Sequence, residues 1–453
     1  MIGVQTIGNA TLVAYDKLPI LSTDPWMGGD HSANFGSWRL PYDIPDNIRQ
    51  DIFKSEYIWF SHGHQDHLNP DSLHLFKNNK ILISDHFGSR IYKDLKSENF
   101  KVTILEDRKW INLSKNISIM PISTKIQDTI LLLRVNNDVF INLNDAGPYS
   151  SRFIKKTTSK FRRKFLLSIS SYEADMLNFF DENNNFIKPP IADIFSAGKV
   201  LSAIAKTVGA KFIIPFSSFH EYQREDSVWA NKYTIPIDKI SNDISKNHIY
   251  IKPFTYINCN KDDDFISLNI KKKKLEVKSP KLFGDNWEDE LNSSDKKIIE
   301  NYFNKFLSFK EKIGFISFIV GGKELNLKFN GPKNKGISFE LPKNSLLSAC
   351  ENRVFDDLLG ANFMKTKLYN LQSLYEPKAN FGYNVCKFGD NGKVYSEEEL
   401  KKYRNYYAKR MGMEYFYDLF SDTCRDYFIY FFKNYQKSKY YDHFKKAYYF
   451  FLK

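Results

Sequence analysis

The chain of 453 residues is long enough to bury a large core, and 42% of its residues are hydrophobic, which excludes an intrinsically disordered protein. Its formal net charge of +13 invites an anionic partner, but no recognisable nucleic-acid-binding module is present. We therefore expect no nucleic-acid partner, and we interpret Lys-rich runs such as residues 271–274 as solvated surface.

The N-terminal segment has no basic region followed by an apolar one, and no apolar run approaches the length of a membrane span. These features predict a cytoplasmic protein. The four cysteines lie far apart without C-x-x-C spacing, which favours free thiols over disulfides or an iron–sulfur site. They are Cys259, Cys350, Cys386 and Cys424.

The first residues of the chain have the pattern expected for strands of a two-sheet core. Residues 1–24 alternate apolar and polar side chains, as strands do, and a loop punctuated by Gly and Pro follows at residues 26–46. In that loop His31 is a candidate for lining a pocket, with a surface position as the alternative. Residues 48–53 predict a short helix, and residues 57–61 predict a buried strand.

Four candidate metal ligands follow this strand in the sequence YIWFSHGHQDHL, namely His62, His64, Asp66 and His67. In extended or turning backbone His62 and His64 point to the same side, whereas Asp66 and His67 lie beyond the turn and can face a second ion. Imidazole and carboxylate suit zinc, iron or manganese, and paired ions can activate water or oxygen. The cluster predicts one or two transition-metal ions, zinc or iron. The alternative is three histidines on a solvated loop.

This H-x-H-x-D-H pattern resembles the metallo-β-lactamase superfamily, and roughly residues 1–260 share the likeness. The resemblance implies an α/β fold, a four-layer αββα sandwich that carries metals at one edge of two packed sheets. Within the superfamily the likeness is greatest to the cytidine-monophosphate N-acetylneuraminate hydroxylases, which are non-haem iron enzymes. Besides the histidine cluster, their pattern is similar to Asp24-Pro25-Trp26, Asn142-Leu143-Asn144-Asp145, Pro215-Phe216-Ser217-Ser218-Phe219 and, more faintly, Asp356-Asp357-Leu358-Leu359.

Further strands and a helix follow the cluster. Residues 69–71, Asn-Pro-Asp, predict a helix start with Pro at an early position. Residues 80–84 and 101–105 predict strands, and residues 117–123 and 129–135 predict a hairpin.

At the end of that hairpin's first strand the superfamily usually places a third histidine for the first metal. Residues 123–125 are Ser-Thr-Lys instead. The first site is therefore either weak or completed by another residue, for which Asp128 and His86 are candidates. Lys125 could also replace the charge of a cation.

The resemblance implies two more ligands. Asp145, at the end of a predicted strand, matches the superfamily's bridging carboxylate, with a turn cap before Gly147 as the alternative. The final histidine, a ligand of the second metal, corresponds to His220, which follows the predicted strand at residues 210–216, with Glu221 as the alternative. Beyond it Arg224 lies in a charged loop, and we predict that it contacts an anionic substrate.

The predicted domains are a catalytic domain at residues 1–260, an α+β appendage at 261–395 and a helical tail at 396–453. The tail opens with a Ser-x-x-Glu capping box and is rich in aromatic residues and Lys. Aromatic stripes at helical spacing indicate a covered core face or an oligomer interface, so homo-oligomerisation through these helices is one reading. Contact with a membrane surface is the alternative.

The metal ligands and the resemblance together predict two alternative functions. The first is a metal-dependent hydrolase in which a metal-bound hydroxide attacks an anionic small molecule, with Asp66 as ligand and catalytic proton acceptor; the resemblance implies a glycan- or nucleotide-related substrate. The second, which the resemblance implies, is a non-haem di-iron oxygenase that hydroxylates a sugar-nucleotide-like substrate. The hydroxylases named above carry an N-terminal Rieske domain, and this sequence begins directly at the metallo-β-lactamase-like part, so an oxygenase would require an external electron donor.

Overall fold

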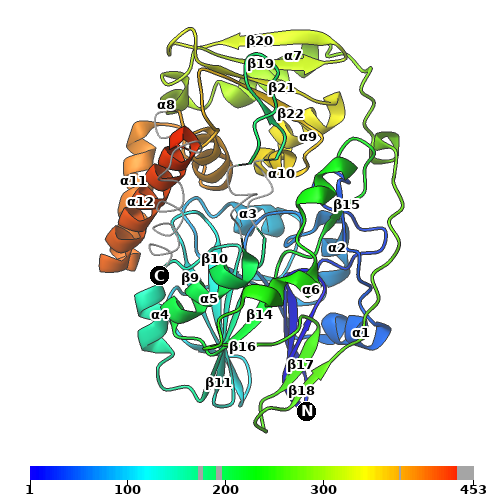
Figure 1. Ribbon diagram of the computed structural model, residues 1–453, viewed down its shortest axis with the longest axis vertical. Helices are drawn as coiled ribbons and strands as arrows, with labels where there is room; N and C mark the ends of the chain where they lie inside the picture. The colour runs from blue at the N-terminus through cyan, green and yellow to red at the C-terminus, as the bar shows by residue number, and fades with distance from the viewer. Residues whose placement is uncertain (172–176, 190–195, 377–378, 436–453) are drawn as a thin grey trace.

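The computed structural model describes residues 1–171, 177–189, 196–376 and 379–435, with side chains up to residue 424. The predicted tail beyond residue 435 lies outside the described residues. The chain forms two large packed sheets with a smaller sheet beyond one end of them and two long helices along one side (Figure 1). None of the described helices is both long and apolar enough to cross a membrane. The four cysteines are free thiols, as predicted.

The first sheet has eight strands in the order β18-β17-β1-β2-β3-β5-β6-β7. Their bounds are β1 (Ile2–Ile7), β2 (Thr11–Asp16), β3 (Leu18–Thr23), β5 (Tyr57–Phe60), β6 (Lys80–Ser84), β7 (Val102–Leu105), β17 (Thr255–Asn258) and β18 (Phe265–Ser267). The second sheet has seven strands in the order β16-β14-β12-β11-β10-β9-β8. Their bounds are β8 (Ile111–Asn112), β9 (Ile117–Ser123), β10 (Thr129–Val135), β11 (Asp138–Asn144), β12 (Arg163–Ile169), β14 (Phe212–Phe216) and β16 (Ile249–Tyr250).

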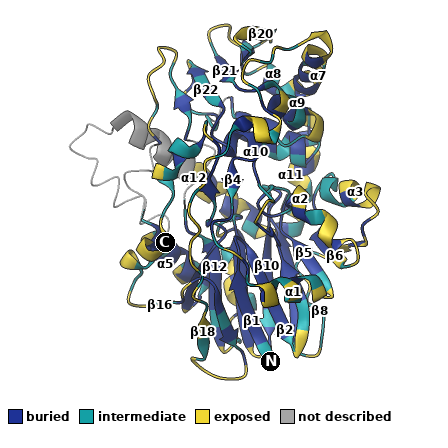
Figure 2. Cartoon of the chain, turned by 90° about the vertical axis from the view of Figure 1, so that its right-hand side faces the viewer, coloured by how far each residue is buried: buried dark blue, intermediate teal, exposed yellow. Residues whose placement is uncertain are grey.

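Apolar side chains fill the space between these sheets and also cover their outer faces. Trp59 of the first sheet belongs to the same buried cluster as Leu131, Phe140 and Phe165 of the second. The strands in the middle of the sandwich are buried along almost their whole length, as the dark blue ribbons of Figure 2 show. Because both faces of these strands are covered, their sequences are nearly continuous apolar runs.

Helices pack on both outer faces of the sandwich. Those over the first sheet are α1 (Asp46–Lys54), α2 (Pro70–Leu73) and α3 (Arg90–Ser97), and those over the second are α4 (Ser151–Thr157), α5 (Ala197–Val208) and α6 (Ile237–Ile240). Helix α5 shows the local reasons for its bounds: the Ser196 hydroxyl caps its first turn, and Gly209 ends it with a left-handed φ of 76°. The predicted four-layer αββα sandwich is confirmed.

A smaller unit with its own core follows in the sequence. Its five-stranded sheet has the order β13-β22-β21-β19-β20, with β13 (Phe179–Phe180), β19 (Phe315–Val320), β20 (Lys323–Lys328), β21 (Gly336–Glu340) and β22 (Lys365–Tyr369). Its helices are α7 (Ser293–Phe303), α8 (Leu307–Lys310), α9 (Lys343–Asn352), α10 (Phe355–Gly360) and the π-helix η6 (Gly382–Asn391). A cluster of buried phenylalanines, including Phe303, Phe318, Phe339 and Phe381, fills the space between sheet and helices.

The sheets do not follow the predicted boundary at residue 260 strictly. Strand β18 lies beyond it yet extends the first sheet, and β13 lies before it yet pairs with β22 of the smaller unit. A two-stranded ribbon of β4 (Trp38–Arg39) and β15 (Glu221–Tyr222) also joins distant parts of the chain. The remaining short helices are η1 (His74–Phe76), η3 (Val228–Tyr233), η4 (Ser241–Asp243) and η5 (Pro280–Phe283).

The C-terminal helices are α11 (Glu397–Met411) and α12 (Met413–Tyr435). The predicted capping box is present at the start of α11, where Ser396 and Glu399 each accept a hydrogen bond from the other's backbone amide. Tyr403 and Tyr407 of α11 are buried in a cluster that includes Phe87 and Phe388. Within the described residues, α11 therefore packs on the body of the protein.

Candidate metal centre

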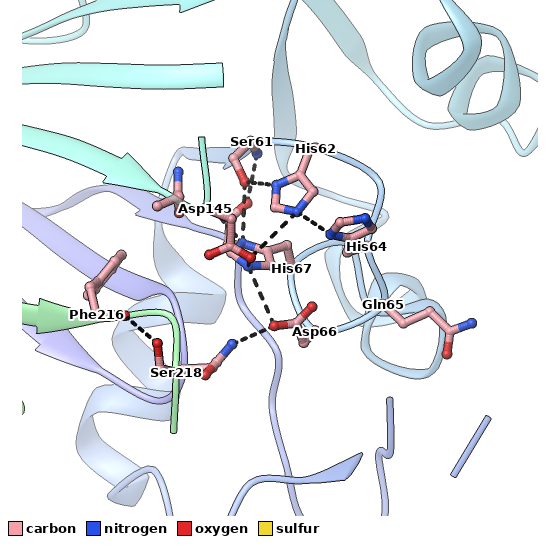
Figure 3. A network of polar contacts seen from close by, with 12 residues as sticks. Ser61, His62, His64, Gln65, Asp66, His67, Asp145, Phe216 and Ser218 are labelled. Carbon is pink, nitrogen blue, oxygen red and sulfur yellow. Dashed lines mark hydrogen bonds and ion pairs between the residues drawn. The ribbon is translucent and has the colours of Figure 1, made fainter. Parts of the chain in front are cut away.

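The histidine loop begins where β5 ends, at the edge of the sandwich nearest the smaller unit. Strands β3, β5 and β6 run parallel, so their carboxyl ends meet at this edge. The backbone amides of His67 and Leu68 both bond the carbonyl of His64, at 3.0 and 2.8 Å, and this turn aims the side chains inward. Strand β11 of the facing sheet ends beside the loop and delivers Asp145 (Figure 3).

The predicted ligands form two groups that share one carboxylate. His62, His64 and Asp145 make the first group, Asp66, His67 and Asp145 the second, and the candidate ligand atoms within each lie within 4.8 Å of one another. Asp145 Oδ2 is 4.0 Å from His62 Nε2 and 3.3 Å from His67 Nε2. Figure 3 shows these side chains pointing toward one another. The structure thus brings His62, His64, Asp66 and His67 together around Asp145, and the bridging of two ions by Asp145 stays a prediction.

The donor atoms of these groups are suited to cations. His67 Nε2 and Asp145 Oδ1 are both buried, and neither has a hydrogen-bond partner among the described residues. Burial, with the charges of His67 and His64, holds the pKa of His62 well below its usual range, whereas burial raises the pKa of Asp66. Buried carboxylates and imidazoles with unpartnered lone pairs are the groups that a divalent transition metal coordinates. The residues therefore fit a metal centre.

A metal ligand keeps its direction only if other groups hold it, and two groups hold His67. Its Nδ1 lies 3.1 Å from Asp24 Oδ2 and 3.3 Å from Ser61 Oγ, and the other oxygen of Asp24 accepts the Ser61 amide at 2.8 Å. The contact with Asp24 places the ring proton on Nδ1 and leaves Nε2 for a ligand bond. Asn9 Nδ2 donates to Asp66 Oδ2 at 2.8 Å and holds that carboxylate in turn.

The smaller unit supplies the partners of His64, which the sequence did not assign to the site. His64 Nε2 lies 2.9 Å from Asp356 Oδ2 of α10, and Lys387 Nζ of η6 pairs with the same oxygen at 2.8 Å. Burial and Lys387 lower the pKa of His64, but the hydrogen bond to Asp356 and the charges of Asp356 and Asp357 together outweigh them and raise it to about 9. The neighbouring Asp357 accepts the Gln65 amide at 3.0 Å. The Asp-Asp-Leu-Leu likeness was the only sequence signal for these contacts.

His220 lies outside both ligand groups. Its ring stacks on Trp38 with centroids 3.5 Å apart and an interplanar angle of 4°, and no group in the described ranges of the chain forms a hydrogen bond with its buried Nδ1. Burial lowers the pKa of His220 to about 3, so the imidazole is neutral. The alternative ligand, Glu221, forms ion pairs with Arg39 at 2.7 Å and with Lys272 at 2.9 Å, so its carboxylate is engaged outside both ligand groups.

Of the candidates for the missing third ligand, His86 is wrong. Both its nitrogens are engaged by hydroxyl groups, Nδ1 with Tyr407 at 2.9 Å and Nε2 with Thr129 at 2.8 Å. Lys125 does not replace a cation, because it pairs with Asp422 of α12. Asp128 is buried close enough to His64 and Asp145 to interact with their charges, and it stays a candidate.

The predicted substrate contact of Arg224 is wrong, because this side chain is fully buried. Its guanidinium makes a bidentate pair with Asp226 at 3.0 and 2.8 Å and a further pair with Asp285 at 2.8 Å. It also stacks on Phe363, 3.9 Å from the ring centroid. Its hydrogen-bonding capacity is used within the protein. His31, the other candidate for the pocket, bonds Ser72 at 2.9 Å and belongs to neither ligand group.

Arg224→Met is expected to destabilise the fold without removing metal. Loss of the guanidinium leaves the buried Asp285 carboxylate unpaired, which lowers the free energy of unfolding by roughly 3–5 kcal/mol. Chemical denaturation and elemental analysis on the same sample measure both effects. Lys80→Met, which breaks an exposed pair with Glu56, is the control and leaves stability nearly unchanged. A stable Arg224→Met protein would contradict the structural role.

Comparison with known proteins finds only partial likenesses. No protein-family model matches the chain. It is 25% identical over 160 residues to a protein of Mycolicibacterium smegmatis described as a Rieske 2Fe-2S iron-sulfur protein, a match that covers 32% of this chain and only 30% of that relative.

Several solved structures resemble parts of the chain. Igni18, a metallo hydrolase of Ignicoccus hospitalis, is 12% identical with a TM-score of 0.36 and covers 56% of this chain and 97% of its own. The metallo-β-lactamase fold protein YhfI of Bacillus subtilis is 12% identical with a TM-score of 0.33, covering 56% and 97%. CmlA, a diiron β-hydroxylase of Streptomyces venezuelae, is 11% identical with a TM-score of 0.33, covering 48% and 45%. Both hydrolases and an oxygenase are thus among the neighbours, and likenesses this distant do not bear on the reaction.

Proposed function

We propose that the chain is a dinuclear metal-dependent enzyme of the metallo-β-lactamase superfamily. The observation that carries the proposal is that the candidate ligands fall into two groups that meet at Asp145. A carboxylate between two cations neutralises charge on both, and Asp145 is the carboxylate that the two groups share. The unpartnered atoms of His67 and Asp145 support the same reading.

Hydrolysis of an anionic small molecule is the first candidate reaction, because it requires only the ions and water. Ions held here, zinc or iron, would lower the pKa of a water molecule to near neutrality and polarise the scissile group. The protein's part is to fix the ligands. Asp24 and Ser61 hold His67, Asn9 orients Asp66, and Asp66 is positioned to accept a proton as well as to bind an ion.

Oxygenation by a di-iron centre is the second candidate. The first group, His62, His64 and Asp145, has the two-histidine, one-carboxylate composition that is typical of non-haem iron oxygenases. The partial likeness to a protein described as a Rieske iron–sulfur protein supports the same reading. This reaction would require an external electron donor, and a sugar-nucleotide-like substrate is the class we propose for it.

The anionic character of the substrate is supported by a cation at the centre rather than by Arg224. The charge of Lys387 acts to lower the pKa of His62, His64 and Asp128, although burial raises the pKa of Asp128 overall and the carboxylates of α10 raise that of His64. Asp356 pairs with Lys387 at 2.8 Å and offsets its charge, so we propose that the bound ions supply most of the attraction for a negatively charged ligand.

Metal analysis of protein purified without added metal tests the proposal. We expect one to two transition-metal ions per chain, and His64→Ala combined with His67→Ala is expected to remove most of them because each group loses a ligand. His74→Ala, an exposed histidine outside both groups, is the matched control and retains its metal. Full metal content in the double variant would contradict the assignment. Zinc in the wild-type protein supports hydrolysis, and iron with an optical absorption band supports oxygenation.

A further inference from the structure

Helix α12 reaches two loops that bear carboxylates of the candidate centre. One loop, residues 124–128, joins β9 to β10 and ends in Asp128. The other, residues 145–150, follows β11 and begins with Asp145. Neither loop belongs to a helix or strand that could fix its position, so their placement depends on what packs against them.

A single buried carboxylate of α12, Asp422, contacts both loops. Tyr149 Oη donates to its two oxygens at 3.1 and 3.0 Å, and Lys125 Nζ forms an ion pair with one of them. The side chains of Lys125 and Asp422 are only 12% and 11% exposed, so the pair is largely shielded from water. The ammonium group also lies 5.5 Å from the centroid of the Tyr149 ring. The three side chains form one contact between the helix and the two loops.

Each contact lies close in sequence to a site carboxylate. In the first loop the amide and hydroxyl of Thr124 bond the carbonyl of Asp128 at 2.9 and 2.8 Å, so Lys125 belongs to the same tight turn. The Tyr403 hydroxyl of α11 donates to the carbonyl of Lys125 and holds that turn from the other side. A shift of Lys125 is therefore transmitted to Asp128.

In the second loop, Tyr149 is followed by Ser150, whose amide donates to Asp418 of α12 at 3.0 Å. The segment between Asp145 and Tyr149 is short, and its Ala146 amide bonds the carbonyl of Leu143 at 2.9 Å. The position of Tyr149 thus restricts where the Asp145 carboxylate lies.

We propose that Asp422 is a positioning residue of the metal centre, which holds Lys125 and Tyr149 together and so fixes the placement of Asp128 and Asp145. The inference rests on the proposed function, because it presupposes that these loops serve a metal. Displacement of a ligand by a fraction of an ångström weakens coordination, and residues that orient ligands typically change metal affinity by about 10–100-fold when replaced. The C-terminal helices are then part of the functional unit.

The test compares the metal affinity of full-length variants, measured by competition of the metal-free protein with a chromophoric chelator for Zn²⁺. Asp422→Asn keeps an acceptor for Tyr149 but removes the charge that pairs with Lys125, and we expect affinity to fall about tenfold. Glu398→Gln is the matched control, because it breaks an exposed pair with Lys402 on α11, and it leaves affinity unchanged.

Two further variants separate positioning from folding. Tyr149→Phe removes only the hydroxyl, keeps the ion pair and is expected to weaken Zn²⁺ binding to a smaller extent. Lys125→Met weakens it as Asp422→Asn does, and the two effects are less than additive in the double variant because both break one contact. Lowered melting temperatures with unchanged Zn²⁺ affinity in all of them would overturn the inference. Absence of Zn²⁺ binding by the wild-type protein would instead overturn the proposed function, and the inference with it.

Discussion

Asp145→Asn is expected to lose most of the bound metal while the protein stays folded. The amide keeps the size of the side chain but removes the negative charge that both ligand groups share. Because His62 and His67 each approach Asp145 Oδ2, at 4.0 and 3.3 Å, neither group retains its full ligand set. Activity of either class should fall together with metal content.

Metal content and melting temperature measured on one sample separate this result from a structural role. An Asp that only caps a turn before Gly147 lowers stability by roughly 0.5–2 kcal/mol on substitution and leaves the metal in place. Asp138→Asn is unsuitable as a control because the fully buried Asp138 carboxylate pairs with Arg162 and with the buried Arg163, whereas Asp71→Asn, at an exposed helix start, is suitable. Retained metal with a lowered melting temperature would remove the main support for a dinuclear centre.

Asp356→Asn is expected to weaken the first ligand group selectively. His64 loses the carboxylate that bonds its Nε2 at 2.9 Å, and Lys387 loses the charge that neutralises it beside the ions. A change of about 10–100-fold in the affinity of the more weakly held ion is the size expected for such partners. Stepwise titration of the metal-free protein with Co²⁺, followed by its absorption, measures the two sites separately.

The adjacent carboxylate provides the control for this prediction. Asp357→Asn, on the same helix, retains an oxygen acceptor for the Gln65 amide, and in the described part of the chain no hydrogen bond joins Asp357 to a ligand imidazole. We expect its Co²⁺ titration to match that of the wild-type protein. Equal Co²⁺ titrations for Asp356→Asn and Asp357→Asn would show that the smaller unit covers the centre without changing its metal affinity.

Much of the centre could be predicted because its ligands are local features of the chain. His62, His64, Asp66 and His67 follow one buried strand within a single turn, so their spacing alone brings them together. Asp145 was predicted from the resemblance, which implies a bridging carboxylate after this strand, and strand β11 does end beside the histidine loop. The strands of the two sheets could be predicted for the same reason. Alternation of apolar and polar side chains, or a continuous apolar run, indicates which faces of a strand are buried.

Contacts between segments that are far apart in the sequence could not be predicted from such local patterns. The charged loop around Arg224 in the sequence indicates a solvent-facing side chain. In the folded chain its guanidinium group contacts Asp285 and Phe363, which only tertiary packing brings next to it. Asp356 reaches His64 across 292 positions because the smaller unit docks on the edge of the sandwich.

The sequence by itself determined the sandwich and the ligand cluster, because each is encoded by neighbouring residues. Tertiary structure alone decided which side chains support the ligands and which candidates are excluded. His86 carries the right chemistry, but Tyr407 and Thr129 occupy both its nitrogens. A residue's type sets what it can bind, whereas the partners that reach it in the folded chain set what it does bind, because buried polar groups are satisfied by whichever groups pack against them.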